Sequence, residues 1–406
     1  MRSATRVTLW APLILTACSM GATVPPAEPT ATAGLEECGQ PSGNPELPPD
    51  LPAESAAGHV AAYLNDGGSV SSLSAWAEER AQLGEMFQGK TLAEADFDGD
   101  MRLDIALVAT AEPFEWVWII LLCRAGRYVP AHVVREGPEW RALVVHRAQD
   151  LDADDRADLL VGRWTCGAHT CFDQLQVLMW RDEGFENRLS GASDDLPYPD
   201  IGVRDPVGDG SHPIVVTGTA IGSVGAGPYR PRERVWRWDA AADLYRVSED
   251  RLLPAEYRVH VLHDADRAYR EGDAAAAREL YLRVIEDGSL LDWEESGARR
   301  MELAGYARFR MVLVSLIQGD ASSAERAYDE LRGSHPAGSP GAGFAEMGAV
   351  FWEVWEETGK IEAGCAAARA FADAQPELVL QPLDYGYANP AYTAEDLCPL
   401  VERGGS

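Results

Sequence analysis

The sequence predicts a multidomain α+β protein in which repeated antiparallel β units precede an array of helical hairpins. Aspartate-rich loops recur at regular spacing in the middle of the chain, each followed by an apolar, strand-like run. The C-terminal third is rich in Ala, Leu, Glu and Arg, with apolar residues at helical spacing. The expected parts are an export signal (1–17), a Pro-rich linker (18–53), a short helical segment (54–92), a β domain (93–250) and a helical domain (251–406).

The charge of the chain excludes one class of partner. The sequence holds 65 acidic against 35 basic residues, which gives a formal net charge of −30 at pH 7. Binding to nucleic acid depends on clustered Lys and Arg that release counterions from the phosphates. No segment of the chain is basic, so the sequence predicts no nucleic acid partner, and attraction of the bare protein to an anionic membrane is equally disfavoured.

Residues 1–17 have the pattern of a bacterial export signal. Arg2 and Arg6 precede an apolar stretch that is too short to span a bilayer. The run that ends at Cys18, LTAC, resembles the bacterial lipobox. The resemblance implies that Cys18 is lipidated and anchors the protein in the cell envelope. The alternative is an ordinary signal peptide, with Cys18 incidental.

The residues that follow Cys18 extend these expectations. Ser19 stands where an Asp would retain a Gram-negative lipoprotein in the inner membrane, so the resemblance favours the outer membrane in such an organism. The linker contains eight prolines before residue 53 and is expected to be extended. Helical patterns are predicted over residues 53–65 and 73–86.

Six cysteines remain after Cys18, and an even number in an exported chain predicts disulfides. Six cysteines allow fifteen connectivities, which proximity can only rank. Cys166 and Cys171 flank a hairpin loop, and Cys365 and Cys398 share the helical region. Cys38 and Cys123 then remain by elimination. The alternative of a metal site formed by Cys166, His169 and Cys171 is less favoured, because the spacing departs from that of zinc pairs.

The β domain begins with two aspartate-rich loops. Residues 96–104 read DFDGDMRLD and residues 150–158 read DLDADDRAD, and an apolar run follows each. Both loops place carboxylates at positions 1, 3, 5 and 9, where they can surround a hard cation such as Ca²⁺. The alternative is a solvated turn without an ion. The predicted calcium ligands are Asp96, Asp98, Asp100, Asp104, Asp150, Asp152, Asp154 and Asp158.

A third, reduced copy of the loop keeps only Asp205 and Asp209. The three copies begin at residues 96, 150 and 205, which are 54 and 55 residues apart and indicate a repeat. About four strand-like runs follow the first loop, at 104–110, 115–124, 127–134 and 140–147. Four strands in a unit of this size are typical of a propeller blade.

These loops and strands resemble the FG-GAP or VCBS repeats of integrin-type β-propellers over residues 93–250. The resemblance implies structural calcium sites. Position 6 of the loop, normally Gly, is Met101 in the first copy and Asp155 in the second. Three units are too few to close a propeller, so the expected architecture is propeller-like but incomplete.

The helical domain contains three helix-turn-helix patterns, with turns at Gly272-Asp273, Gly319-Asp320 and Gly359-Lys360. A small residue and an aromatic residue follow the first two glycines at the same spacing, and such pairs let helices approach closely. The pattern resembles tetratricopeptide repeats over residues 258–378, which implies a groove that binds a protein or peptide. The alternative is a helical bundle that only packs against the β domain. The aligned positions are Ala277 and Tyr281, Ala324 and Tyr328, and Gly364 and Ala368.

No set of residues predicts catalysis. His260 and His263 have HxxH spacing but lack the HExxH pattern, and neither Ser223 nor Ser339 lies in a GxSxG context. The sequence therefore favours a non-enzymatic, lipid-anchored envelope protein that acts as a protein-interaction or assembly module. The alternatives are a surface lipoprotein that binds a glycan or another ligand in adhesion or sensing, and an unrecognised envelope hydrolase.

Overall fold

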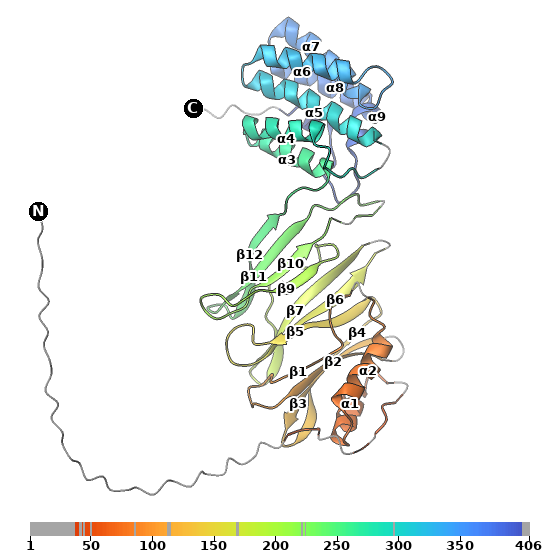
Figure 1. Ribbon diagram of the computed structural model, residues 1–406, viewed down its shortest axis with the longest axis vertical. Helices are drawn as coiled ribbons and strands as arrows, with labels where there is room; N and C mark the ends of the chain where they lie inside the picture. The colour runs from red at the N-terminus through yellow and green to blue at the C-terminus, as the bar shows by residue number, and fades with distance from the viewer. Residues whose placement is uncertain are drawn as a thin grey trace, which may run out of the picture. The chain divides into compact units, whose positions relative to one another are not determined.

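The computed structural model describes residues 37–39, 43, 45–48, 51–84, 87–111, 115–167, 170–220, 222, 223, 225–294 and 297–399. The export signal, Cys18, Ser19 and most of the linker lie outside the described residues. The described residues form two helices, then three four-stranded antiparallel sheets, then a helical region, which confirms the α+β class (Figure 1).

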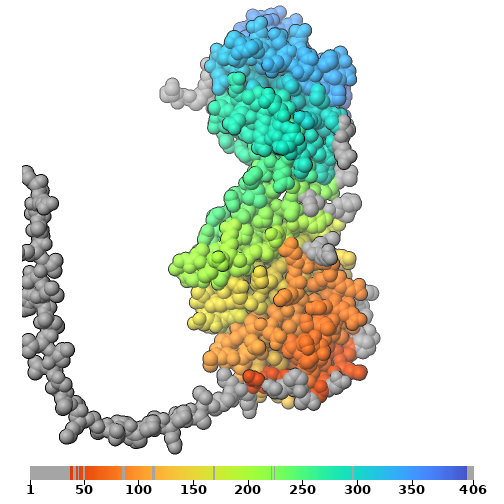
Figure 2. All heavy atoms as spheres, viewed as in Figure 1, coloured from red at the N-terminus to blue at the C-terminus, as the bar shows by residue number. Residues whose placement is uncertain are grey.

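Two helices precede the sheets, α1 (Ala56–Asn65) and α2 (Val70–Ala81), where the sequence predicts helices over 53–65 and 73–86. Ser69 caps α2 by accepting a hydrogen bond from the backbone N–H of Ser72. Apolar residues of both helices share a core with the first sheet, so the helices cover one face of that sheet. Figure 2 shows this segment on the surface of the molecule.

Each sheet is a meander whose strands neighbour one another in chain order. The first holds β1 (Leu92–Ala95), β2 (Asp104–Ala111), β3 (Glu115–Arg124) and β4 (Arg127–Glu136). The second holds β5 (Ala142–Gln149), β6 (Asp158–Cys166), β7 (Cys171–Arg181) and β8 (Gly184–Asn187). The third holds β9 (Asp200–Val203), β10 (Ile214–Gly218), β11 (Arg232–Asp239) and β12 (Leu244–Leu252).

The repeat boundaries differ from those predicted. The run at 140–147, counted with the first unit, is β5, which begins the second sheet. Each sheet takes its first strand from the residues before its aspartate loop, so the loop is the turn between the first two strands. The register shows why, because Ala95 pairs with Asp104 and Gln149 pairs with Asp158 across the loop.

The three sheets pack face to face and have two different ends. One apolar core joins the first and second sheets, and another joins the second and third. On the far face of the third sheet Glu233 pairs with Arg204 at 3.0 Å and with Arg251 at 2.7 Å. Since helices cover one end and charged side chains line the other, nothing in the described residues closes the sheets into a ring.

Three helical hairpins follow, with their turns where the sequence predicts them. The pairs are α3 (Arg258–Arg270) with α4 (Ala274–Glu286), α5 (Ala298–Ile317) with α6 (Ala321–Ser334), and α7 (Ala342–Thr358) with α8 (Ile361–Ala374). Asp273 and Asp320 cap α4 and α6. The small and aromatic residues that mark the pattern, from Ala277 to Ala368, are buried between the helices.

The chain then turns back through three short helices, α9 (Pro376–Val379), η1 (Gln381–Leu383) and α10 (Ala394–Leu397). Residues 384–398 form what we call the C-terminal strap. The Tyr392 hydroxyl donates to Asp266 of α3 at 2.6 Å, and Arg310 of α5 donates to the carbonyl of Asp396 at 2.9 Å. The strap therefore covers the face of α3 and α5 that their partner helices leave free.

The strap also contacts the β region. The backbone N–H of Ala388 donates to the carbonyl of Ala226 at 3.1 Å, and the Asn389 amide donates to the carbonyl of Pro228 at 3.1 Å. Nearby, Arg230 and Asp264 form an ion pair at 2.9 Å. One segment thus connects the loop before β11 to the helical hairpins.

Three disulfides join the cysteines that the sequence pairs, two by proximity (Cys166–Cys171 and Cys365–Cys398) and one by elimination (Cys38–Cys123). Because Cys166 and Cys171 are bonded to each other, their thiolates are not free to bind a metal, and His169 lies outside the described residues. No helix in the described part of the chain is both long and apolar enough to span a membrane.

Candidate metal centre

Two aspartate loops occupy the same position in consecutive sheets, between the first and second strands. In each loop the first Asp organises the turn. Both oxygens of Asp96 accept backbone N–H groups, from Gly99 at 2.8 Å and from Met101 at 2.7 Å. Asp150 does the same for Ala153 at 2.8 Å and Asp155 at 3.0 Å. These bonds fold the loop into a tight arc.

Position 6 of each loop adopts the left-handed backbone conformation that the resemblance implies for a Gly. The φ angles are 66° at Met101 and 67° at Asp155. A residue with a Cβ carries strain in that conformation, on the order of 1 kcal/mol. The loop geometry therefore persists although neither repeat has the favoured residue.

The ninth residue of each loop is a buried carboxylate at the start of a strand. Asp104 accepts backbone N–H groups from Phe97 at 2.9 Å and from Cys123 at 2.7 Å. Asp158 accepts from Leu151 at 2.9 Å. Burial raises the pKa of Asp104 to about 6 and that of Asp158 to about 8, against backbone hydrogen bonds that lower both.

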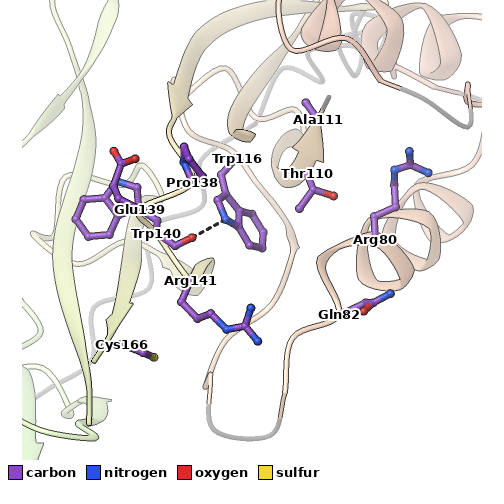
Figure 3. Close-up of a pocket in the computed structure, with 10 residues that line it drawn as sticks. All are labelled: Arg80, Gln82, Thr110, Ala111, Trp116, Pro138, Glu139, Trp140, Arg141 and Cys166. Carbon is purple, nitrogen blue, oxygen red and sulfur yellow. Dashed lines mark hydrogen bonds between the residues drawn. The ribbon is translucent and has the colours of Figure 1, made fainter. Parts of the chain in front are cut away.

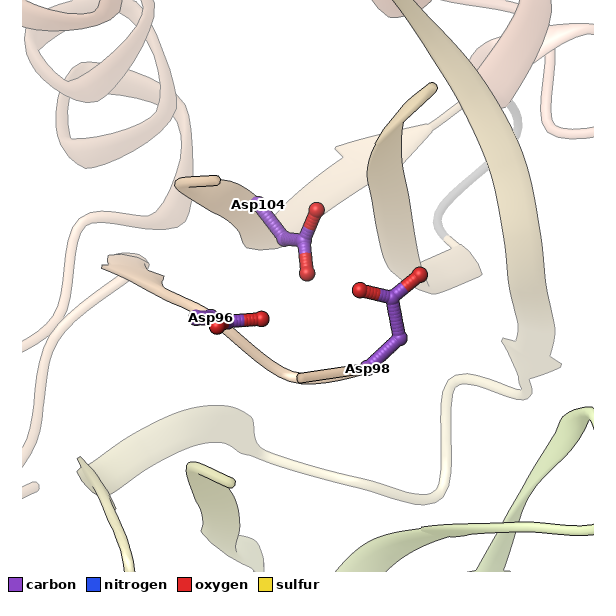
Figure 4. Close-up of side chains that lie close together, drawn as sticks. All are labelled: Asp96, Asp98 and Asp104. Carbon is purple, nitrogen blue, oxygen red and sulfur yellow. The ribbon is translucent and has the colours of Figure 1, made fainter. Parts of the chain in front are cut away.

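Three carboxylates meet in each loop. One oxygen each from Asp96, Asp98 and Asp104 lie within 4.8 Å of one another, and Figure 4 shows these side chains pointing toward a common centre. The second loop gathers Asp150, Asp152 and Asp158 in the same way.

The donor set of the second loop fits a hard cation. Oδ1 of Asp152 and Oδ1 of Asp158 are buried, and no described residue donates a hydrogen bond to them. A buried carboxylate oxygen without a donor is costly, and a divalent cation bound by oxygen ligands would remove that cost. Asp150, Asp152 and Asp158 would hold such an ion, and Asp96, Asp98 and Asp104 would hold its counterpart.

The carboxylates at loop position 5 stay outside these groups of three. Asp100 accepts the backbone N–H of Arg102 at 2.9 Å and pairs with its guanidinium at 3.3 Å. Asp154 pairs with Arg181 at 3.1 Å. Because positions 1, 3 and 5 alternate evenly along the loop, spacing alone does not distinguish position 5 from the carboxylates that converge.

An arginine at the end of the third strand distinguishes the two loops. Arg181 of β7 contacts Asp152 at 2.5 Å, and 17% of its side chain is exposed. Its counterpart Arg124 of β3 contacts Asp98 at 3.3 Å, and 51% of its side chain is exposed. The second loop thus already has a close cationic partner, whereas the first is more open to an ion from solution.

The third loop gathers no comparable set among the described residues. Asp209 accepts the backbone N–H of Ser211 at 3.0 Å and its hydroxyl at 2.7 Å, as in an ordinary turn. The second strand of the third sheet, β10, begins with Ile214, whereas the second strands of the other two sheets begin with an aspartate.

The structure also brings together two residues that the sequence does not single out. His146 of β5 and Asp173 of β7 form a 2.8 Å contact in the second sheet, with side chains only 5% and 0% exposed. Gly162 of β6 makes room for this pair. The residues are far apart in sequence and share no motif, so no local signal could have found them.

The histidines of the HxxH pattern lie where the β region meets the helices. Nε2 of His260 contacts the carbonyl of Pro228 at 3.1 Å, and burial lowers the pKa of His260 to about 4. No group of three metal-ligating side chains includes His260 or His263 in the described part of the chain.

Comparison with known proteins adds no assignment, because neither protein-family models nor curated proteins match the chain.

Proposed function

We propose that the protein is a lipid-anchored, non-enzymatic component of the bacterial cell envelope that acts as a protein-interaction or assembly module braced by calcium. One observation carries the proposal: matched groups of three carboxylates lie at the same place in two consecutive sheets. The resemblance of these loops to FG-GAP or VCBS repeats favours Ca²⁺ as the cation. Cys18 supplies the lipid anchor, because the run LTAC that ends at this residue resembles a lipobox.

The position of the loops supports a structural role for the ion. Phe97, at position 2 of the first loop, is buried against Phe185 of the second sheet, with ring centroids 6.1 Å apart. Tyr245 of the third sheet donates its hydroxyl to the carbonyl of Leu151, at position 2 of the second loop, at 2.6 Å. An ion in either loop would therefore hold the contact between neighbouring sheets.

The helical hairpins carry the proposed interaction with a protein, by their resemblance to tetratricopeptide repeats. The strap fills the inner face of α3 and α5, so the proposed partner binds the outer helices α4, α6 and α8. Exposed charges of both signs along α6, such as Arg326 and Asp329, are typical of a polar contact surface.

The cation is tested by titrating the full chain with Ca²⁺ or luminescent Tb³⁺. We expect at most two sites, with Asp98→Ala removing one and Asp152→Ala the other. Asp100→Ala is the matched control, because Asp100 lies in the same loop but outside the three converging carboxylates, and it should keep both sites. Absence of binding at millimolar Ca²⁺ would reject the calcium part of the proposal.

The interaction role is tested by crosslinking and co-purification from native membranes, with the crosslinker attached to the helical region. Recovery of a defined protein through crosslinks on α4, α6 or α8 would support the proposal. Recovery of none, together with retention of the protein on purified cell wall, would favour the glycan-binding alternative instead.

A further inference from the structure

A cation that belongs to the chain itself already lies on the carboxylates of the second aspartate loop. Arg181, at the end of β7, contacts Asp152 at 2.5 Å and Asp154 at 3.1 Å. Its guanidinium also donates to the carbonyl of Trp180 at 2.9 Å, and most of the side chain is buried. Hydrogen bonds between charged partners are stronger than neutral ones, so the guanidinium is held firmly against Asp152.

The two oxygens of Asp152 have different surroundings. Oδ2 accepts from the guanidinium, whereas Oδ1 is buried and has no donor among the described residues. In Asp158, Oδ2 accepts the backbone N–H of Leu151, and Oδ1 again has no donor. The side chain of Asp152 is 3% exposed, and Asp158 is 1% exposed. Two buried oxygens are therefore left for a cation, and one of them belongs to a carboxylate that Arg181 already contacts.

The first loop meets its arginine less closely. Arg124, at the end of β3, has the position in the first sheet that Arg181 has in the second. It contacts Asp98 at 3.3 Å, and about half of its side chain is exposed. Solvent and salt screen an exposed charge much more than a buried one. Arg124 should therefore oppose an incoming cation less than Arg181 does.

Arg181 has a second carboxylate within reach, on the third sheet. Its Nε lies 3.4 Å from Oδ1 of Asp243, in the turn between β11 and β12. A divalent cation in the second loop would repel the guanidinium, because the two positive charges would share the carboxylate of Asp152. The guanidinium can then move toward Asp243 and still keep a carboxylate partner.

We propose that Arg181 is an internal competitor of Ca²⁺ at the second loop. The two loops then fill in order: the first binds at low calcium, and the second fills only at a higher concentration, as Arg181 leaves Asp152 for Asp243. The contact between the second and third sheets thus depends on the calcium concentration. This inference rests on the proposed calcium sites and adds the residue that regulates one of them.

The test titrates the purified full chain with Ca²⁺ by calorimetry. We expect two sites whose dissociation constants differ at least tenfold, with Asp98→Ala removing the tighter site and Asp152→Ala the weaker. Arg181→Gln should tighten the weaker site at least tenfold, because the competing charge is gone. Arg181→Lys keeps a positive charge and should leave the weaker site within threefold of its original affinity.

Arg141→Gln is the matched control, because it removes the same charge from the other end of the second sheet. Arg141 directly precedes β5 and lines a pocket of about 640 Å³ there (Figure 3), whereas the second loop follows β5. The eight residues of this strand span about 25 Å, well beyond the Debye length of about 8 Å at physiological salt. The control should leave both affinities within threefold of those of the unaltered chain.

The direction of the change separates competition from positioning. If Arg181 held Asp152 in place for the ion, Arg181→Gln would weaken the second site, and this result would overturn the inference. Two equal affinities in the unaltered chain, or equal changes in the Arg181→Gln and Arg141→Gln variants, would overturn it as well but leave the calcium sites standing.

Absence of any binding would instead reject the calcium sites, and this inference with them. Thermal melting without calcium shows whether Arg181→Gln is folded. If it is not, the order of the two affinities in the unaltered chain, together with Arg181→Lys, still decides.

Discussion

Asp104 and Asp158 lie in an environment unlike that of aspartates in an ordinary turn. Each begins a buried strand, and burial raises the pKa of both carboxyl groups, to about 6 and about 8 respectively. An aspartate with a raised pKa binds its proton more tightly in the folded state, so its contribution to stability falls as the pH rises from about 4 toward that value. A bound cation would replace the proton and remove this penalty at neutral pH.

Gly162 stands where the structure leaves no room for even a methyl side chain. A Cβ at this position would lie 2.5 Å from the carboxylate oxygens of Asp173 and from Nε2 of His146. Gly162→Ala should therefore lower the free energy of unfolding by about 1–3 kcal/mol, because the buried pair must move. Urea unfolding followed by fluorescence measures the change.

Gly202→Ala is the control for this variant. Gly202 also lies in a strand, β9, and no heavy atom stands within 4 Å of an added Cβ. The control should keep the stability of the unaltered chain or raise it slightly, because alanine restricts the unfolded state. An equal loss of stability in both variants would contradict the explanation that crowding at Gly162 destabilises the fold.

At the scale of single residues, the sequence predicted six of the carboxylates that converge in the two loops. It also included Asp100 and Asp154, because spacing treats every second residue of a loop alike. What separates them is the folded shape of the loop and not the contact with an arginine, since Arg181 contacts Asp152 of the converging group as well as Asp154. The contact between His146 and Asp173 depends on strand register.

Among the elements, the helical hairpins and the strap depend on one another. Arg310 and Asp266 are almost completely buried, and both are bonded to the strap. Buried charges are costly unless hydrogen bonds and opposite charges surround them. The strap therefore completes the interior of the helical region rather than lying loosely over it.

The Cys365–Cys398 disulfide should contribute strongly to this arrangement. It closes a loop of 33 residues and holds the end of the strap against α8. Replacing both cysteines with serine should lower the free energy of unfolding by about 3–4 kcal/mol. Hydrogen exchange should also rise first in residues 384–398.

Removal of the Cys166–Cys171 disulfide, which closes a loop of only 5 residues, provides the comparison. A short loop restricts the unfolded chain less, so the loss should be smaller. Unchanged exchange in the strap of the double serine variant would show that its hydrogen bonds alone hold it.

The sequence predicted the elements more reliably than their connections. Alternating strands and the turns at Gly272, Gly319 and Gly359 are local patterns, and the structure has strands and turns at those places. The sequence places β5, the first strand of the second sheet, in the preceding unit, because a strand before a loop looks no different from one that ends a repeat. The bonds between Asn389 and residues 226–228 join segments far apart in the chain, which no local pattern reveals.

At the scale of the whole molecule, the junction between the β region and the helices is held by polar contacts. The loop that contains Pro228 accepts hydrogen bonds from Asn389 of the strap and lies against His260 of α3. Arg230 and Asp264 add an ion pair beside them. The stability of this junction should therefore depend on pH, because it contains His260.

Protonation of His260 should weaken the junction. Burial lowers its pKa to about 4, whereas an unfolded histidine has a pKa near 6.5. The neutral ring contributes its full stability above about pH 6.5, and this contribution is lost as the pH falls from 6.5 to about 4, to a total of roughly 3 kcal/mol.

The comparison of the unaltered chain with His260→Gln isolates this effect, because the buried aspartates titrate in both proteins. Glutamine keeps a donor for the carbonyl of Pro228 but does not titrate. The difference in the free energy of unfolding between the two should shrink or reverse as the pH falls below 6.5, as followed by urea unfolding at several pH values. A difference that stays constant with pH would contradict the assignment.

The strap comes after every element that it holds together, and this order affects how the protein is made. During synthesis the β units emerge first and the helices next, so the junction at Pro228 and the surroundings of Asp266 and Arg310 are completed only by the last segment. A chain that stops before residue 384 would lack the bonds from the strap to Asp266 and Arg310, and these two charges would keep only their contacts within the helices, including their own ion pair at 3.6 Å. An unfinished molecule would then expose to proteases the helical face that the strap covers in the finished one.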